Sequence, residues 1–188
     1  MRHVRGVLFV DYVRMLRSQK HVDWTTVLAA DDQAYLHARI EPDAWYPMGA
    51  FERLGQAILS AVTRGELFPV QLWGRYSVSA LCTANPGLLA AGDPAESLAR
   101  FRVLRQTFFD FPALELPLLH LDEAHVVVGY HMAGPAEEAA TLQTLGFFEG
   151  LLEQAGARDI RGEVAERCWA GDPRTLLLLR WKPPVPAA

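Results

Sequence analysis

The sequence predicts an α+β fold, in which a helical N-terminal half packs on a four-stranded antiparallel sheet with ββαββ order at the C-terminus. Apolar residues recur at helical spacing as far as Phe109. Two pairs of strand-like segments then flank one long helical segment. The chain has 188 residues and is 51% hydrophobic, which is enough for one sizeable core. We therefore predict a single domain over residues 1–182 and a flexible tail over residues 183–188.

The first sixty residues predict a series of short helices. Apolar residues between Val7 and Leu16 indicate a first helix that ends near Ser18. Asp23 is a typical N-cap for a short helix over residues 24–30. Residues 31–39 predict one or two further helical turns.

Three longer helices follow in the N-terminal half. Pro47 can open a helix whose apolar stripe extends from Met48 to Val62 and which ends at Gly65. Residues 66–81 predict the next helix. The segment Asp93-Pro94-Ala95-Glu96 is a strong helix start, because Asp can cap, Pro suits the first position and Glu can return a bond to the cap.

The C-terminal half predicts two hairpins around a long helix. Leu114–Leu121 and Ala124–Met132 form the first expected hairpin, joined through Asp122-Glu123. A helix then starts at Gly134-Pro135 and stops at Gly156. Asp159–Trp169 and Thr175–Trp181 form the second expected hairpin.

Composition excludes several classes of protein. The formal net charge of -4 argues against general nucleic-acid binding, which usually needs a basic face. No apolar run approaches the roughly 20 residues that span a bilayer, and Asp11 and Arg14 interrupt the N-terminal apolar stretch. We expect a cytoplasmic protein in which Cys82 and Cys168 are reduced. We also expect no enzyme, because no nucleophile motif, phosphate-binding loop or dinucleotide fingerprint occurs.

Four segments carry a resemblance to known families: RGVLFVDYVRML at 5–16, AWYPMGAFERLGQAI at 44–58, LWGRYSVSAL at 72–81, and the block 146–181. The chain resembles an uncharacterised family of small proteins found in myxobacteria. It is more distantly similar to the vinyl-reductase ligand-binding domain, the heme nitric-oxide-binding domain and the small TRAPP subunits. The resemblance implies helices over a four-stranded sheet with a pocket or channel between them, and a role as a small-molecule sensor or an assembly subunit.

The sequence departs from these relatives at their metal and heme positions. The resemblance implies a second cysteine after Gly171-Asp172-Pro173, but Thr175 stands there, so Cys168 lacks a partner for zinc. The relatives that bind heme place a histidine on a central helix, and residues 98–111 contain none. We therefore expect neither a metal nor a heme cofactor.

Aromatic residues are the candidate ligand-binding groups. They could line a pocket for a small apolar or aromatic ligand, or they could simply fill the core. Arg75 could meet an anionic ligand or pair with a carboxylate such as Glu52. The candidates are Trp45, Tyr46, Trp73, Arg75, Tyr76, Phe108, Phe147 and Phe148.

A metal site formed by histidines is a weaker alternative. His120 and His125 could face each other across the first hairpin if its turn has an even length, although two solvated histidines are the more common outcome. No third metal ligand is evident beyond Asp122 and Glu123.

These observations favour a non-enzymatic sensory or regulatory domain that binds a small molecule. The alternative is a protein-interaction or assembly subunit, similar to the TRAPP subunits, with a core filled by side chains. The helices over 7–16 and 67–81 are apolar on more than one side, so we expect a homodimer or a protein partner to cover one of them.

Overall fold

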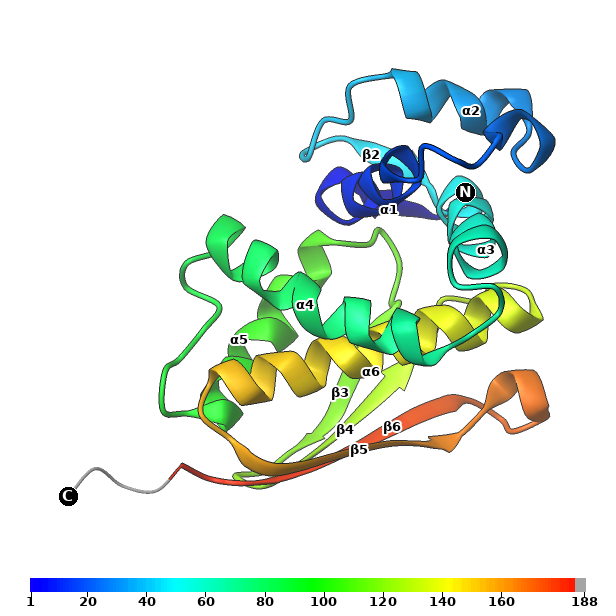
Figure 1. Ribbon diagram of the computed structural model, residues 1–188. Helices are drawn as coiled ribbons and strands as arrows, with labels where there is room; N and C mark the ends of the chain where they lie inside the picture. Colours follow the sequence, from blue (N-terminus) through cyan, green and yellow to red (C-terminus); the bar gives the residue numbers. More distant parts are fainter. Residues whose placement is uncertain (185–188) are drawn as a thin grey trace.

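The computed structural model describes residues 1–184, in which six helices and two antiparallel sheets are arranged in layers (Figure 1). The helices are α1 (Gly6–Ser18), α2 (Ala30–His37), α3 (Met48–Ala57), α4 (Phe68–Ala84), α5 (Pro94–Leu104) and α6 (Gly134–Gln154). The strands are β1 (His3–Arg5), β2 (Trp45–Pro47), β3 (Leu114–Leu119), β4 (Glu123–Val128), β5 (Arg158–Glu166) and β6 (Thr175–Lys182).

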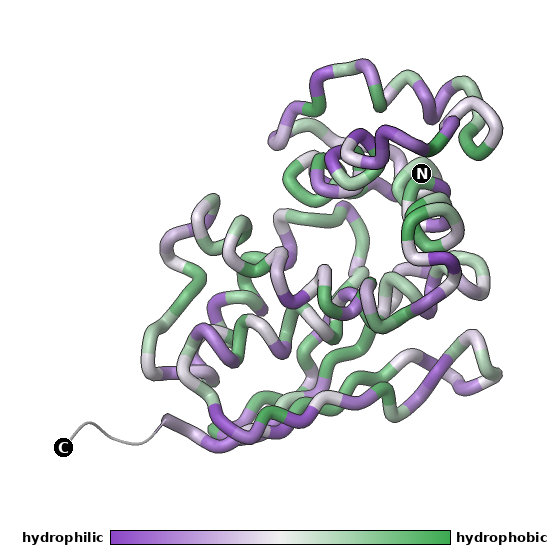
Figure 2. Tube along the Cα trace, in the orientation of Figure 1, coloured by the Kyte–Doolittle hydropathy of each residue, from purple (hydrophilic) through white to green (hydrophobic). Residues whose placement is uncertain are grey.

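The main sheet has the order β3-β4-β6-β5, and each neighbouring pair of strands is antiparallel. Its central strand β6 carries four consecutive leucines, and Figure 2 shows hydrophobic stretches along the sheet. Helix α6 lies over this sheet, and α4 and α5 pack against α6 (Figure 1). The expected ββαββ order and the α+β class are therefore confirmed.

Three glycines bring the backbones of α4 and α6 into direct contact. A Cβ atom at Gly74 of α4 would lie 1.9 Å from the carbonyl oxygen of Gln143. A Cβ at Gly146 would lie 1.9 Å from the carbonyl oxygen of Gln71, and one at Gly150 would lie 2.6 Å from that of Arg75. Only a residue without a side chain fits at these points.

The elements from β1 to α3 form a separate N-terminal layer over α4 and α6 (Figure 1). Helix α1 is buried within its own chain through Phe9, Tyr12, Val13 and Leu16. Strands β1 and β2 pair with the register His3↔Pro47. The sequence did not predict this small sheet, because strands of three residues are too short to show a periodic pattern.

The N-terminal strand is also attached to the segment that leads into the main sheet. Val4 forms a bridge with Phe109, and the backbone N–H of Arg5 donates to the carbonyl of Phe108 at 2.8 Å. His3 Nδ1 lies 2.6 Å from Asp110 Oδ2. Hydrogen bonds from His3 hold the pKa of the Asp110 carboxyl below its usual range. These contacts fix Phe108 and Phe109 in position.

Several predicted boundaries were wrong. Strand β3 ends at Leu119 and not Leu121, and a register shift between Glu115 and Leu118 accompanies Pro117, which has no N–H to donate. Helix α5 ends at Leu104 and continues as a 3₁₀ turn, although the helical spacing of apolar residues extends to Phe109. Residues 58–62 form a π-helical turn after α3.

No helix within residues 1–184 is long and apolar enough to cross a membrane. The expected tail over 183–188 lies largely outside the described residues. Pro183, which is described, accepts hydrogen bonds from Arg158 through its carbonyl.

We predict that Gly146→Ala lowers the free energy of unfolding by more than about 2 kcal/mol, because the new methyl group meets the backbone of α4. Alanine favours an isolated helix over glycine, so the loss reports the interhelical clash. Gly87→Ala is the matched control, since a Cβ there meets nothing within 4 Å. Urea unfolding measures both, and equal stability of the two variants would contradict the close approach of α4 and α6.

Candidate ligand cavity

A cavity of about 90 Å³, called here the main cavity because buried aromatic rings line it, lies between the N-terminal layer and the layer of α4, α5 and α6. Two other hollows, of about 340 and 390 Å³, lie beside α4, and Arg75 and Tyr76 line the second of them. This volume exceeds the roughly 10–15 Å³ that one water needs and is below the roughly 150 Å³ of an apolar cavity that accepts benzene. Its wall consists of Leu8, Asp11, Tyr12, Phe51, Ser77, Leu81, Phe101, Phe108, Phe109, Leu114, Tyr130, Ala140, Gln143, Thr144 and Phe147.

The main cavity has a buried base and a partly exposed mouth. The base carries six aromatic side chains, each no more than 6% exposed, namely Tyr12, Phe51, Phe101, Phe108, Phe109 and Tyr130. Leu8, Asp11, Ser77 and Phe147 are half-buried and therefore form the side that faces solvent. The mouth lies between α1 on one side and α4 and α6 on the other.

Two buried tyrosines contribute hydroxyl groups to the wall. The Tyr130 hydroxyl lies 2.6 Å from Thr144 Oγ1, which donates to the carbonyl of Ala140 at 2.8 Å. Because the Thr144 proton is used, Tyr130 is the donor in its bond to Thr144. Tyr12 donates to Gln143 Oε1 at 2.5 Å. Burial raises the pKa of both tyrosines well above the ordinary range, so both remain neutral at physiological pH.

Asp11 is the only ionisable carboxylate on the wall of the main cavity. Burial raises the pKa of its carboxyl group, and the guanidinium of Arg14, 3.5 Å away, opposes this shift. Arg14 is exposed and lies on the outer side of α1. The wall of the main cavity contains no lysine, arginine or histidine.

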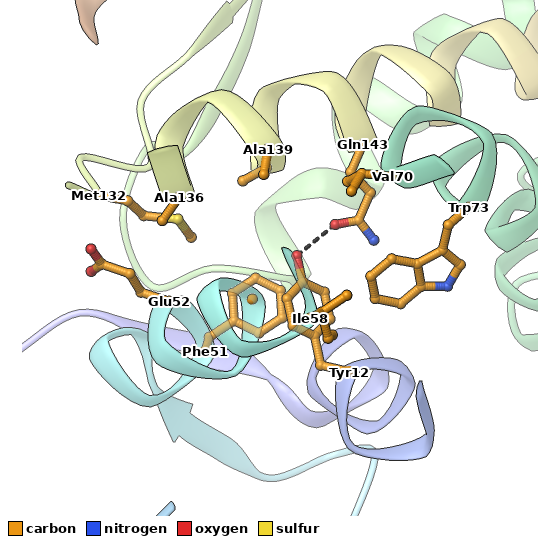
Figure 3. A pocket seen from close by; sticks show the side chains of 12 residues that line it. Tyr12, Phe51, Glu52, Ile58, Val70, Trp73, Met132, Ala136, Ala139 and Gln143 are labelled. Carbon is orange, nitrogen blue, oxygen red and sulfur yellow. Dashed lines mark hydrogen bonds between the residues drawn. The ribbon is translucent and has the colours of Figure 1, made fainter. Parts of the chain in front are cut away.

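A second, smaller cavity adjoins the first and has a volume of about 10 Å³, close to the space of a single water. Figure 3 shows its wall, where Phe51, Ile58 and Trp73 face the α6 residues Ala139 and Gln143. Tyr12 and Gln143 line both cavities, and the hydrogen bond between them lies at the boundary between the two. The amide nitrogen of Gln143 points toward Trp73 (Figure 3).

The predicted ligand-binding residues are distributed over several places. Phe108 and Phe147 line the main cavity, and Trp73 lines the smaller one. Phe148 is fully buried and packs edge-on against Phe101 with a centroid distance of 5.0 Å. It contributes to the core beside the cavity wall.

The remaining four candidates lie outside both cavities. The exposed Trp45 packs under Arg5, whose Cζ lies 4.7 Å from the ring centroid. Tyr46 stacks on Phe9 at 4.4 Å. Arg75 pairs with Glu153 of α6 at 2.8 Å, and Tyr76 is 70% exposed on α4.

The suggested partner of Arg75 and the suggested histidine pair were both wrong. Glu52 accepts the backbone N–H of Ala133 instead of pairing with Arg75. Leu118 lies opposite His125 across the hairpin, while the backbone N–H of His120 donates to Glu123 in the turn. The turn places His120 opposite Glu123, so the two histidines do not face each other. Within residues 1–184, no group of three or more histidine, cysteine or acidic side chains could hold a metal ion.

The two cysteines are free and differ in exposure. Cys82 is half-buried on α4, and burial raises the pKa of its thiol. Cys168 is exposed after β5, and its Sγ accepts a hydrogen bond from Thr175 at 3.0 Å.

Sequence reasoning missed the polar wall of the main cavity. Asp11 and Tyr12 belong to the first helix. In the sequence, Asp11 was interpreted as an interruption of an apolar segment, and Tyr12 as part of the apolar stripe of the helix. Tyr130 follows a strand and Gln143 lies in the long helix. No local pattern links these positions, because they belong to separate segments that meet only in the folded chain.

Comparison with known proteins identifies the fold. No family model and no curated protein sequence matches the chain. An Fe(II) unliganded H-NOX protein from K. algicida is 15% identical with a TM-score of 0.67, over 98% of this chain and 100% of that one. An H-NOX protein from S. oneidensis in the Fe(II)NO ligation state is 10% identical with a TM-score of 0.61, over 95% and 99% of the two chains.

A third similar structure is an oxygen-binding H-NOX domain related to soluble guanylate cyclases, with 17% identity and a TM-score of 0.60, over 98% of each chain. At such identities the likeness establishes the fold alone. The resemblance to the heme nitric-oxide-binding fold is therefore confirmed, whereas the narrower resemblance to a myxobacterial family receives no support.

We predict that the free energy of unfolding falls as pH rises above about 10, the pKa of tyrosine in an unfolded chain. Unfolded tyrosines ionise there, while Tyr12 and Tyr130 stay protonated in the fold, so the unfolded state binds fewer protons. Each contributes a slope of up to about 1.4 kcal/mol per pH unit. In urea unfolding at several pH values, the free energy of unfolding should fall less steeply with pH for the double variant Tyr12→Phe and Tyr130→Phe than for the exposed control Tyr76→Phe. Identical slopes would contradict the conclusion that Tyr12 and Tyr130 stay protonated in the folded protein.

Proposed function

We propose that residues 1–182 form a non-enzymatic sensory domain that binds a small apolar or aromatic molecule in the main cavity. The observation that carries this proposal is the cavity itself, which is mostly apolar and has a few convergent polar groups. Such a wall is typical of small-molecule sites. Its volume of about 90 Å³ restricts the ligand to a very small molecule unless the wall opens.

The position of the main cavity supports a regulatory role. Its wall combines residues of α1 and α3 with residues of α4, α5 and α6. A ligand there contacts both layers and stabilises one arrangement of them over another. The use of the same fold by an oxygen-binding domain supports the proposal by analogy only.

A heme does not fit the main cavity. Its volume of about 90 Å³ is well below the roughly 300–1,000 Å³ of ordinary ligand and cofactor pockets. Heme iron is held by histidine, cysteine, methionine or tyrosine, and the wall offers only Tyr12 and Tyr130 from this set. Both of their hydroxyl groups already donate to side chains of α6. The proposed sensory function therefore uses no heme.

The hydroxyl groups of the wall also favour binding over catalysis. Ser77 donates to the carbonyl of Gly74, and Tyr12 donates to the amide oxygen of Gln143. Neither hydroxyl is held by a basic group that could activate it as a nucleophile. Asp11 pairs with Arg14 at 3.5 Å.

We predict that a thermal-shift screen of benzene-sized and smaller molecules identifies ligands that raise the melting temperature. A ligand at 100 times its dissociation constant adds about 2.7 kcal/mol to the free energy of unfolding. Ala140→Leu fills the main cavity and should abolish the shift. Ala80→Leu makes the same change on the exposed side of α4 and should preserve it. If no molecule stabilises the wild-type protein, the sensory proposal fails.

An alternative function is supported by a separate observation on α4. Phe68 and Tyr76 are 73% and 70% exposed, and Leu72 lies between them on the same side of the helix. An exposed apolar row of this kind is typical of protein-interaction surfaces. The alternative is an assembly subunit that forms a homodimer or binds another protein through α4.

We predict that light scattering at micromolar concentration gives about twice the 20.9 kDa chain mass if α4 forms a homodimer interface. Phe68→Lys with Tyr76→Lys should then restore the single-chain mass, because buried lysines at an interface are strongly unfavourable. Val103→Lys is the control, since Val103 is 72% exposed on α5. A wild-type mass of one chain would contradict the homodimer.

A further inference from the structure

We propose that the main cavity is selective for a small organic cation, an alkylated ammonium ion, over neutral molecules of the same size. This inference rests on the proposed ligand-binding function and names its ligand class. It is carried by the aromatic content, the charge and the hydrogen-bonding capacity of the cavity wall.

Aromatic rings dominate the wall. Seven of its fifteen residues are phenylalanine or tyrosine. Phe101 lies within 6.2 Å of Phe108 and within 5.2 Å of Phe147, measured between ring centroids, and Phe109 lies 5.6 Å from Tyr130. Aromatic faces attract cations within about 6 Å, and clusters of rings are the usual way in which proteins bind quaternary ammonium groups.

The charge of the wall has one sign. Asp11 stands at the half-buried mouth, and the wall contains no basic residue. The neighbouring Arg14 is 69% exposed on its side chain. A cation entering the main cavity passes a carboxylate, whereas an anion meets that same carboxylate and no compensating positive charge inside.

The hydroxyl groups of the wall can only accept further hydrogen bonds. The protons of Tyr12 and Tyr130 are donated to Gln143 and Thr144. Those of Thr144 and Ser77 are donated to backbone carbonyl groups. The amide nitrogen of Gln143 points toward Trp73 in the smaller cavity (Figure 3). Lone pairs therefore face the ligand, and lone pairs favour a positively charged ligand or one that donates protons.

The size and depth of the main cavity favour a free ion over a group on a macromolecule. The rings at its base are no more than 6% exposed. A volume of about 90 Å³ is filled by the ion itself, and the stem of a peptide or lipid would have to leave past Asp11 through the half-buried mouth. The ligand is accordingly a free ammonium ion with a few methyl groups.

The test is a titration of the protein followed by two-dimensional NMR. Tetramethylammonium and methylammonium chloride are the cationic probes, and sodium chloride keeps the ionic strength constant. The neutral probes are tert-butanol and methanol, which match the two cations in size and shape. We expect each cation to bind at least about tenfold more tightly than its neutral match, with shifts at Phe101, Phe108 and Tyr130.

Two variants separate the charge from the rings. Asp11→Asn should weaken tetramethylammonium binding at least about threefold and leave tert-butanol unchanged. Asp43→Asn, at an exposed position outside the cavity wall, is the matched control and should change neither. Phe147→Leu keeps an apolar wall without the ring, so it should weaken only the cation. Its melting curve verifies that it folds.

The outcomes test separately the selectivity for cations, the sensory function and the assignment to a free ion. Equal binding of cationic and neutral probes overturns the selectivity but leaves the sensory proposal standing. If no probe binds and the fragment screen is also negative, the sensory proposal itself fails. Tighter binding of trimethyllysine amide than of tetramethylammonium would overturn the assignment to a free ion.

Discussion

The close approach of α4 and α6 is the constraint on which the other features depend. Gly74 and Gly146 allow the two backbones to touch, since any Cβ there would overlap a carbonyl of the facing helix. The contact fixes the relative position of Ser77 on α4 and of Gln143, Thr144 and Phe147 on α6, all of which line the main cavity. One wall of the main cavity is thereby a rigid pair of helices, and α1 contributes the opposite wall.

The polar groups of the main cavity follow from the same arrangement. Buried hydroxyl groups must find acceptors, and α6 supplies them through the side chains of Gln143 and Thr144 and the carbonyl of Ala140. Because the tyrosine protons are directed at α6, the space between the rings is left with acceptors and one carboxylate. The chemistry of the cavity is thus a consequence of how α1 and the segment after β4 are anchored on the long helix.

The sequence predicted the order of the elements, the main sheet and most helix positions because these depend on local periodicity and caps. Asp93, for example, caps α5 as expected, with its carboxylate accepting the N–H of Glu96. Strand β3 was overextended, because the turn begins at His120, whose backbone N–H donates to the carbonyl of Glu123, and the local pattern does not reveal this pairing. The cavity wall was only partly anticipated. Phe108 and Phe147 were among the candidates, but Asp11 and Tyr130 acquire their place from contacts between distant segments.

The proposed function requires a hollow bounded by aromatic rings inside this fold that admits a ligand. Diffraction from crystals equilibrated with xenon tests it most directly, because xenon enters apolar cavities without any specific chemistry. We expect one xenon site surrounded by Phe101, Phe108 and Tyr130. A core in which side chains occupy that volume, with no xenon bound there, would contradict it.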